Sequence, residues 1–91
     1  MLSEKMASAI SDVLSKMGCT ESYILGSHVT GDADESSDID IGIKGLPPQN
    51  FFATHSMLED ATGKTVDLVD FDEKPKFYEL LKDLGELRKI G

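Results

Sequence analysis

The segment from Asp38 to Ile43, DIDIGI, alternates acidic or glycine positions with isoleucines, and a period of two indicates a β-strand. In such a strand Ile39, Ile41 and Ile43 share one face, while Asp38 and Asp40 share the other. A chain with this segment must therefore cover one face of a sheet with other elements. Its opposite face must carry two carboxylates within roughly 7 Å of each other.

Two carboxylates held this close repel each other unless a cation lies between them. Mg²⁺ suits an all-oxygen site, because it binds one or two carboxylates and keeps coordination places for water and phosphate oxygens. The alternation therefore predicts that Asp38 and Asp40 bind Mg²⁺.

A Gly-Ser turn precedes these aspartates by ten residues. Residues 22–25 are predicted to form a short strand, and Gly26 and Ser27 follow it directly. Glycine allows a tight turn and a close approach of backbone to ligand. Ser27 offers a hydroxyl and an N–H group, and such groups at the start of a helix would bind an anion. A phosphate-binding turn beside a metal-binding strand predicts a site for a metal-bound nucleoside triphosphate.

A third carboxylate commonly completes the metal site when phosphoryl chemistry uses two metal ions. Residues 64–71, KTVDLVDF, are predicted to form a third strand that carries Asp67 and Asp70. Since these residues are three positions apart, a regular strand sends them to opposite faces. The residues themselves leave both candidates open.

Three further segments have the apolar spacing of amphipathic helices, namely residues 3–17, residues 48–62 and a segment that starts at Pro75. The order of elements predicts an α/β (α+β) fold, a small mixed sheet of about three to four strands with helices packed on one face. The inward positions expected in the second helix are Phe51, Phe52, Leu58 and Ala61. Those expected in the last helix are Phe77, Tyr78, Leu81, Leu84 and Leu87.

Composition excludes several classes of protein. The 91 residues are expected to form one domain, residues 1–91. The net charge of −8, from 17 acidic and 9 basic residues, argues against unaided binding of nucleic acid. No apolar run reaches the roughly 18 residues of a membrane span. The single Cys19 excludes an internal disulfide and, with no signal-peptide pattern, favours the cytoplasm.

The motif of Gly26-Ser27, ten residues and then Asp38-Ile39-Asp40 resembles the signature of the polymerase β-type nucleotidyltransferase superfamily. The size of the chain resembles the minimal nucleotidyltransferase branch, whose members often pair with a helical HEPN-type protein. The resemblance covers about residues 1–87. It implies that Gly26 and Ser27 bind the nucleotide and that Asp38 and Asp40 hold Mg²⁺. It also implies that Asp67 is the third metal-binding and catalytic carboxylate.

Burial favours the same choice of Asp67. If Asp67 shares the face of the other two carboxylates, Val66 and Leu68 point into the helix-covered core. With Asp70 in that place, Asp67 would point inward among the isoleucines, where an unpaired charge is costly.

The expected activity is transfer of a nucleoside monophosphate from a nucleoside triphosphate, with ATP expected, to an acceptor hydroxyl, with a two-metal Mg²⁺ site and release of pyrophosphate. A HEPN-type protein partner, as in a toxin–antitoxin pair, or a homo-oligomer is expected. The alternative is a nucleotidyltransferase-like subunit that neutralises a partner by binding, with little or no catalysis.

Overall fold

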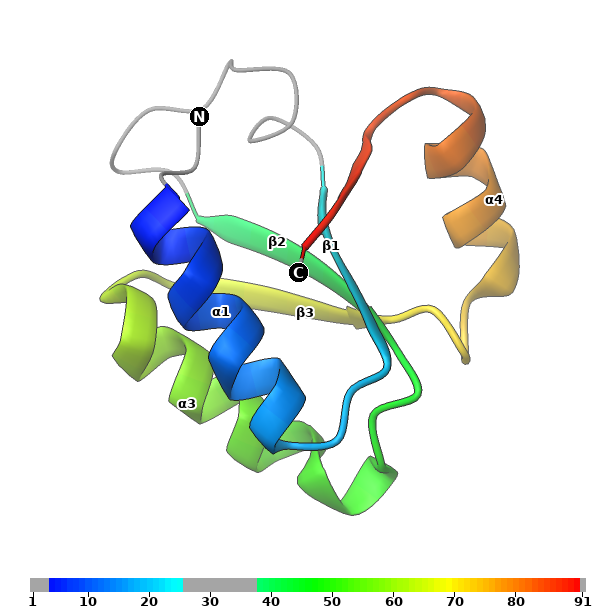
Figure 1. Ribbon diagram of the computed structural model, residues 1–91. Coiled ribbons are helices and arrows are strands. Elements are labelled where there is room, and N and C mark those ends of the chain that lie inside the picture. The colour runs from blue at the N-terminus through cyan, green and yellow to red at the C-terminus, as the bar shows by residue number, and fades with distance from the viewer. Residues whose placement is uncertain (1–3, 26–37, 91) are drawn as a thin grey trace.

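The computed structural model describes residues 4–25 and 38–90, and its elements follow one another as helix, two strands, helix, strand, helix and strand. Figure 1 shows their arrangement. The elements are α1 (Glu4–Lys16), β1 (Glu21–Leu25), β2 (Ile39–Lys44), the short 3-10 helix η1 (Pro48–Asn50), α3 (Phe51–Thr62), β3 (Val66–Asp70), α4 (Pro75–Asp83) and β4 (Leu87–Lys89).

The four strands form one mixed sheet in the order β3-β2-β1-β4. Strand β1 pairs antiparallel with both β2 and β4, whereas β2 and β3 run parallel. A parallel pair needs a crossover connection, and α3 supplies it here. The predicted mixed α/β class is confirmed.

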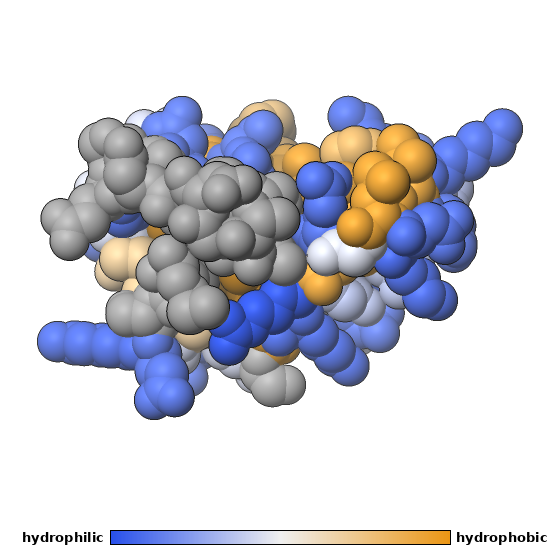
Figure 2. Space-filling model, turned by 90° about the horizontal axis from the view of Figure 1, so that it is seen from above, coloured by the Kyte–Doolittle hydropathy of each residue, from blue (hydrophilic) through white to orange (hydrophobic). Residues whose placement is uncertain are grey.

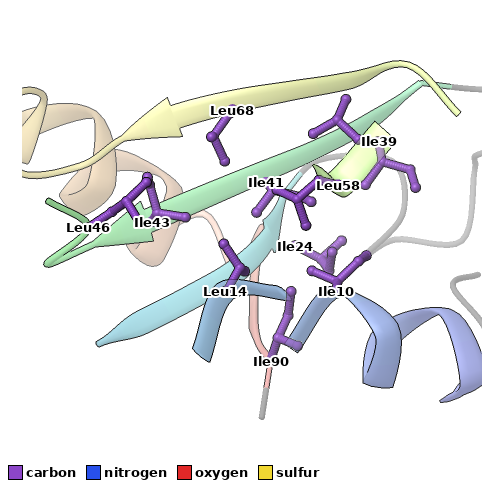
Figure 3. Close-up of a cluster of buried hydrophobic side chains, with 11 residues drawn as sticks. Ile10, Leu14, Ile24, Ile39, Ile41, Ile43, Leu46, Leu58, Leu68 and Ile90 are labelled. Carbon is purple, nitrogen blue, oxygen red and sulfur yellow. The ribbon is translucent and has the colours of Figure 1, made fainter. Parts of the chain in front are cut away.

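Helices α1 and α3 lie side by side over one face of the sheet (Figure 1). The isoleucines of β2 point to this face and are completely buried, as their alternation predicted. Figure 3 shows them between the sheet and the helices, together with Leu14 of α1 and Leu58 of α3. Burying such aliphatic side chains is the main favourable term in folding a chain of this size.

Helix α4 departs from the expectation that all helices pack on one face. It contributes Leu81 and Tyr78 to a second cluster with Tyr23, Leu25 and Phe71. Tyr23 and Leu25 flank Ile24 on β1, so they point to the face opposite the first core. Strand β1 lies inside the sheet and is buried on both faces, which explains its continuous apolar run Tyr-Ile-Leu.

The last predicted helix ends earlier than its apolar spacing suggested. Helix α4 stops at Asp83, Gly85 follows with a positive φ of 71°, and Leu87 begins β4 instead of continuing the helix. Pairing of β4 with β1 therefore overrides the helical spacing. Two residues predicted to point inward are exposed instead. Leu84 is 61% exposed, and Phe52 of α3 is 83% exposed.

The exposed side of α4 is apolar. Phe77, Leu80 and Leu84 lie at helical spacing and form what we call the α4 stripe. Apolar side chains gather over this helix on the right of Figure 2. Within the described residues, no helix has the length and apolar character needed to cross a membrane.

Candidate active site

Strand β2 places Asp40 on the sheet face that α1 and α3 leave open. Its neighbours Ile39 and Ile41 are completely buried under the helices, whereas Asp40 is half-buried and Asp38, just before the strand, is exposed. Because successive side chains of a strand point to opposite faces, Asp40 projects away from the main core. We call this side of the sheet the open face.

Strand β3 brings a second carboxylate beside Asp40. The parallel register pairs Asp40 with Asp67, so the two residues are direct cross-strand neighbours. Neighbouring strands lie about 4.8 Å apart. Asp67 is exposed between the buried Val66 and Leu68, which join the core beneath the helices. The predicted phase of β3 is thus the observed one, and Asp40 and Asp67 share the open face.

Asp70 is placed differently. It pairs with Ile43, on the opposite phase of β3 from Asp67. Its Oδ1 accepts a hydrogen bond from the Asp72 N–H at 2.9 Å, and its backbone carbonyl accepts from the N–H groups of Glu73 and Lys74. Asp70 therefore stabilises the turn between β3 and α4.

The predicted nucleotide-binding residues, Gly26 and Ser27, lie outside the described residues. The structure does define the strand that precedes them. Strand β1 ends at Leu25, one residue beyond the pair formed by Ile24 and Ile41. The chain thus leaves the sheet on the strand next to the one that carries Asp40.

An aromatic cluster continues the open face beyond the carboxylates. Gly42, two residues after Asp40, allows the ring of Phe71 to lie on the strand, because a Cβ atom at Gly42 would come within 2.1 Å of that ring. The Phe71 ring contacts Tyr78 at 5.2 Å and Tyr23 at 6.0 Å between centroids. Burial, with hydrogen bonding to Tyr78, raises the pKa of Tyr23, so its hydroxyl stays neutral. The sequence signal for the close approach of Phe71 to β2 is Gly42, a glycine inside a strand.

The donor chemistry of the open face fits Mg²⁺, since carboxylate oxygens on adjacent strands can share one hard cation. Asp40 and Asp67 are direct cross-strand neighbours, and Asp38 lies two residues before Asp40, just ahead of the strand. In residues 4–25 and 38–90, no three His, Cys, Asp or Glu side chains are grouped closely enough to hold a metal ion. Asp38, Asp40 and Asp67 are therefore not grouped as a three-carboxylate metal site in the described structure.

Comparison with known families identifies this arrangement. The family described as polymerase beta, nucleotidyltransferase matches residues 9–84, which include both carboxylate-bearing strands and all the described helices at least in part. The chain belongs to this nucleotidyltransferase family. No curated protein sequence matches it closely enough to count as a relative.

Solved structures share the nucleotidyltransferase fold. A candidate minimal nucleotidyltransferase superposes with a TM-score of 0.75 at 23% identity, over 90% of this chain and 86% of its own. A toxin–antitoxin structure with AMP-PNP gives a TM-score of 0.63 at 27% identity. A mutant of the toxin–antitoxin pair MntA–HpeT gives 0.62 at 24%. The chain spans only 57% of each of these two longer proteins, with 72% of its own residues aligned.

Two residues near the site were not assigned a role from the sequence. His55 and Glu59 lie one turn apart on α3, and both contact the backbone of Val66. Their spacing of four residues was the only signal in the sequence, and it indicates a shared helix face without naming what that face contacts.

Proposed function

We propose that this nucleotidyltransferase-family protein transfers a nucleoside monophosphate, AMP from ATP, to a hydroxyl group of a partner protein. The observation that carries the proposal is the pairing of Asp40 with Asp67 on the open face of the sheet. The toxin–antitoxin structure with AMP-PNP supports ATP as the nucleotide and a protein as the partner. A HEPN-type partner is our expectation for its class.

In the proposed reaction, the acceptor oxygen attacks the α-phosphorus of ATP. The bond to the bridging oxygen of the β-phosphate breaks, and pyrophosphate leaves. Asp38, Asp40 and Asp67 would hold Mg²⁺, which when bound neutralises charge on the triphosphate and lowers the pKa of the acceptor. Asp67 would accept the proton of the hydroxyl. Gly26 and Ser27 would bind the triphosphate through backbone N–H groups and the serine hydroxyl.

The test uses ATP labelled at the α-phosphate, in parallel with ATP labelled at the γ-phosphate. Each is incubated with the protein, Mg²⁺ and a lysate of the source organism. We expect the α-label alone to appear on a protein acceptor, with release of pyrophosphate. Asp40→Asn should reduce labelling at least about a hundredfold, since it removes a group that organises charge in the transition state. Asp60→Asn, an exposed position on α3, is the matched control.

A second candidate function is binding without catalysis. The α4 stripe favours it, because three large apolar side chains at helical spacing on an acidic chain are suited to contact with another protein. Tight association with a partner that remains unlabelled, by both the unmodified protein and Asp40→Asn, would support this candidate. Transfer of the γ-label instead would refute nucleotidyl transfer.

A further inference from the structure

Among the described residues, β3 is the outer strand of the sheet, so the metal-binding candidate Asp67 lies on a strand with a described neighbour on one side only. The N–H of Ile39 in β2 donates to the carbonyl of Thr65 at 3.0 Å, so Thr65 faces β2. Backbone groups of successive residues in a strand point to opposite edges. The N–H and C=O groups of Val66 therefore point away from β2, toward the outer edge of the sheet that the described residues form.

Two side chains of α3 bind both of these backbone groups. The Val66 N–H donates to Glu59 Oε2 at 3.0 Å, and His55 Nε2 lies 2.6 Å from the Val66 carbonyl oxygen. A carbonyl oxygen can only accept, so Nε2 carries the hydrogen. The same Nε2 lies 3.8 Å from Glu59 Oε2. His55 and Glu59 thus bind Val66 as a neighbouring strand would.

This contact is partly shielded from water. The side chains of His55 and Glu59 are 37% and 36% exposed, and Val66 is only 2% exposed. An edge strand presents unpaired backbone groups that otherwise bind water or another chain. Hydrogen bonds from both groups of one residue to one helix restrain where that residue lies relative to the helix. Asp67 is the next residue along the strand and the cross-strand neighbour of Asp40.

We propose that His55 and Glu59 are positioning residues for Asp67, which hold β3 at the register that places Asp67 beside Asp40. The inference rests on the proposed function, in which these two aspartates bind the metal. A purely structural role would require only that the two side chains contribute to folding stability. The positioning role also requires that loss of His55 or Glu59 alters the pairing of β3 with β2 and the Mg²⁺ concentration needed for activity.

The experiment compares Glu59→Leu, which removes the acceptor, with Glu59→Gln, which keeps an acceptor oxygen but loses the charge. Hydrogen exchange is followed by NMR at the amides of Val66, which donates to Glu59, and Ile39, which donates to Thr65. In Glu59→Leu we expect exchange at least about tenfold faster at the Val66 amide, because its hydrogen bond to a charged group is lost. The Ile39 amide should also exchange at least about tenfold faster, because the pairing of β3 with β2 is loosened. In Glu59→Gln both should stay within about threefold of the unmodified protein.

Nucleotidyl transfer supplies the second readout. For Glu59→Leu the Mg²⁺ concentration that gives half-maximal activity should rise about tenfold while KM for ATP is unchanged, and Glu59→Gln should restore it. Asp60→Leu, the next residue on α3, is the matched control and should change neither readout. If Glu59→Leu does not fold, His55→Phe, which removes the donor to the Val66 carbonyl, is used in its place.

An Ile39 amide that exchanges at its normal rate in folded Glu59→Leu, or an unchanged Mg²⁺ dependence, would overturn the positioning role. If the unmodified protein transfers no nucleotide, the proposed function fails independently. Exchange at Ile39 then still tests whether His55 and Glu59 hold the pairing of β3 with β2, since this measurement does not depend on activity.

Discussion

At the scale of single residues, two aspartates three positions apart on β3 have different surroundings. Asp67 stands on the open face beside Asp40, while Asp70 accepts the Asp72 N–H in the turn that follows the strand. Both are acidic and lie on the same short strand, so composition does not distinguish them. Their different neighbours follow from the alternation of side chains along a strand.

This difference predicts opposite outcomes for two identical substitutions. Asp67→Asn should reduce nucleotidyl transfer at least about a hundredfold. The asparagine amide lacks the negative charge that would bind the metal and the basic oxygen that would accept the proton of the hydroxyl. Asp70→Asn should leave substantial activity, because an amide oxygen can still accept the Asp72 N–H. The measurement is transfer from α-labelled ATP by each variant, with thermal unfolding to show that both are folded. The reverse pattern would assign the metal-binding role to Asp70.

At the scale of elements, α4 carries leucines in two environments. Leu81 is 7% exposed and packs with Tyr23, Leu25 and Phe71, whereas its neighbour Leu80 is 53% exposed on the α4 stripe. Helix α4 therefore packs on the sheet through Leu81. Leu80 lies at the surface, where it can contact another molecule.

Truncation of each leucine should therefore have unequal effects on stability. Leu81→Ala should lower the free energy of unfolding by about 2–4 kcal/mol, because it opens a cavity in the second cluster. Leu80→Ala should lower it by less than about 0.5 kcal/mol, since little burial is lost. Urea unfolding of the two variants measures both values. Equal losses would show that α4 does not pack on the sheet as described.

At the scale of the whole molecule, the net charge of −8 leaves the folded chain with more acidic than basic groups to repel one another. A cation bound specifically to the folded state stabilises it by mass action, whereas general screening by salt acts on all exposed charges alike. Thermal unfolding can separate the two contributions.

Mg²⁺ should raise the melting temperature more than NaCl of the same ionic strength. At ten times the dissociation constant the gain is about 1.4 kcal/mol, which corresponds to roughly 5–10 °C for a domain of this size. The Asp40→Asn variant should lose the part specific to Mg²⁺ and keep the part due to salt. An equal shift in Mg²⁺ and NaCl for the unmodified protein would count against a metal site on this sheet.

The sequence by itself determined the features that depend on neighbours a few positions away. The alternation around Asp40 predicted a strand with buried isoleucines on one face, and the apolar spacing of residues 3–17 and 48–62 predicted the helices that cover them. The phase of β3, with Val66 and Leu68 inward, also followed from local burial, because an aspartate among isoleucines is costly. The roles of the aspartates in binding metal remain predictions.

Only the tertiary structure decided the features that depend on residues far apart in the chain. Helical spacing continued through Leu87, yet that residue left the helix because β1 offers it an edge to pair with. Helix α4 took the open face because Tyr23 and Phe71 form an apolar surface there, which neither shows alone in the sequence. The contact of His55 and Glu59 with Val66 is likewise non-local. Local periodicity fixes which side of an element is apolar, whereas the partner of that side depends on how the whole chain packs.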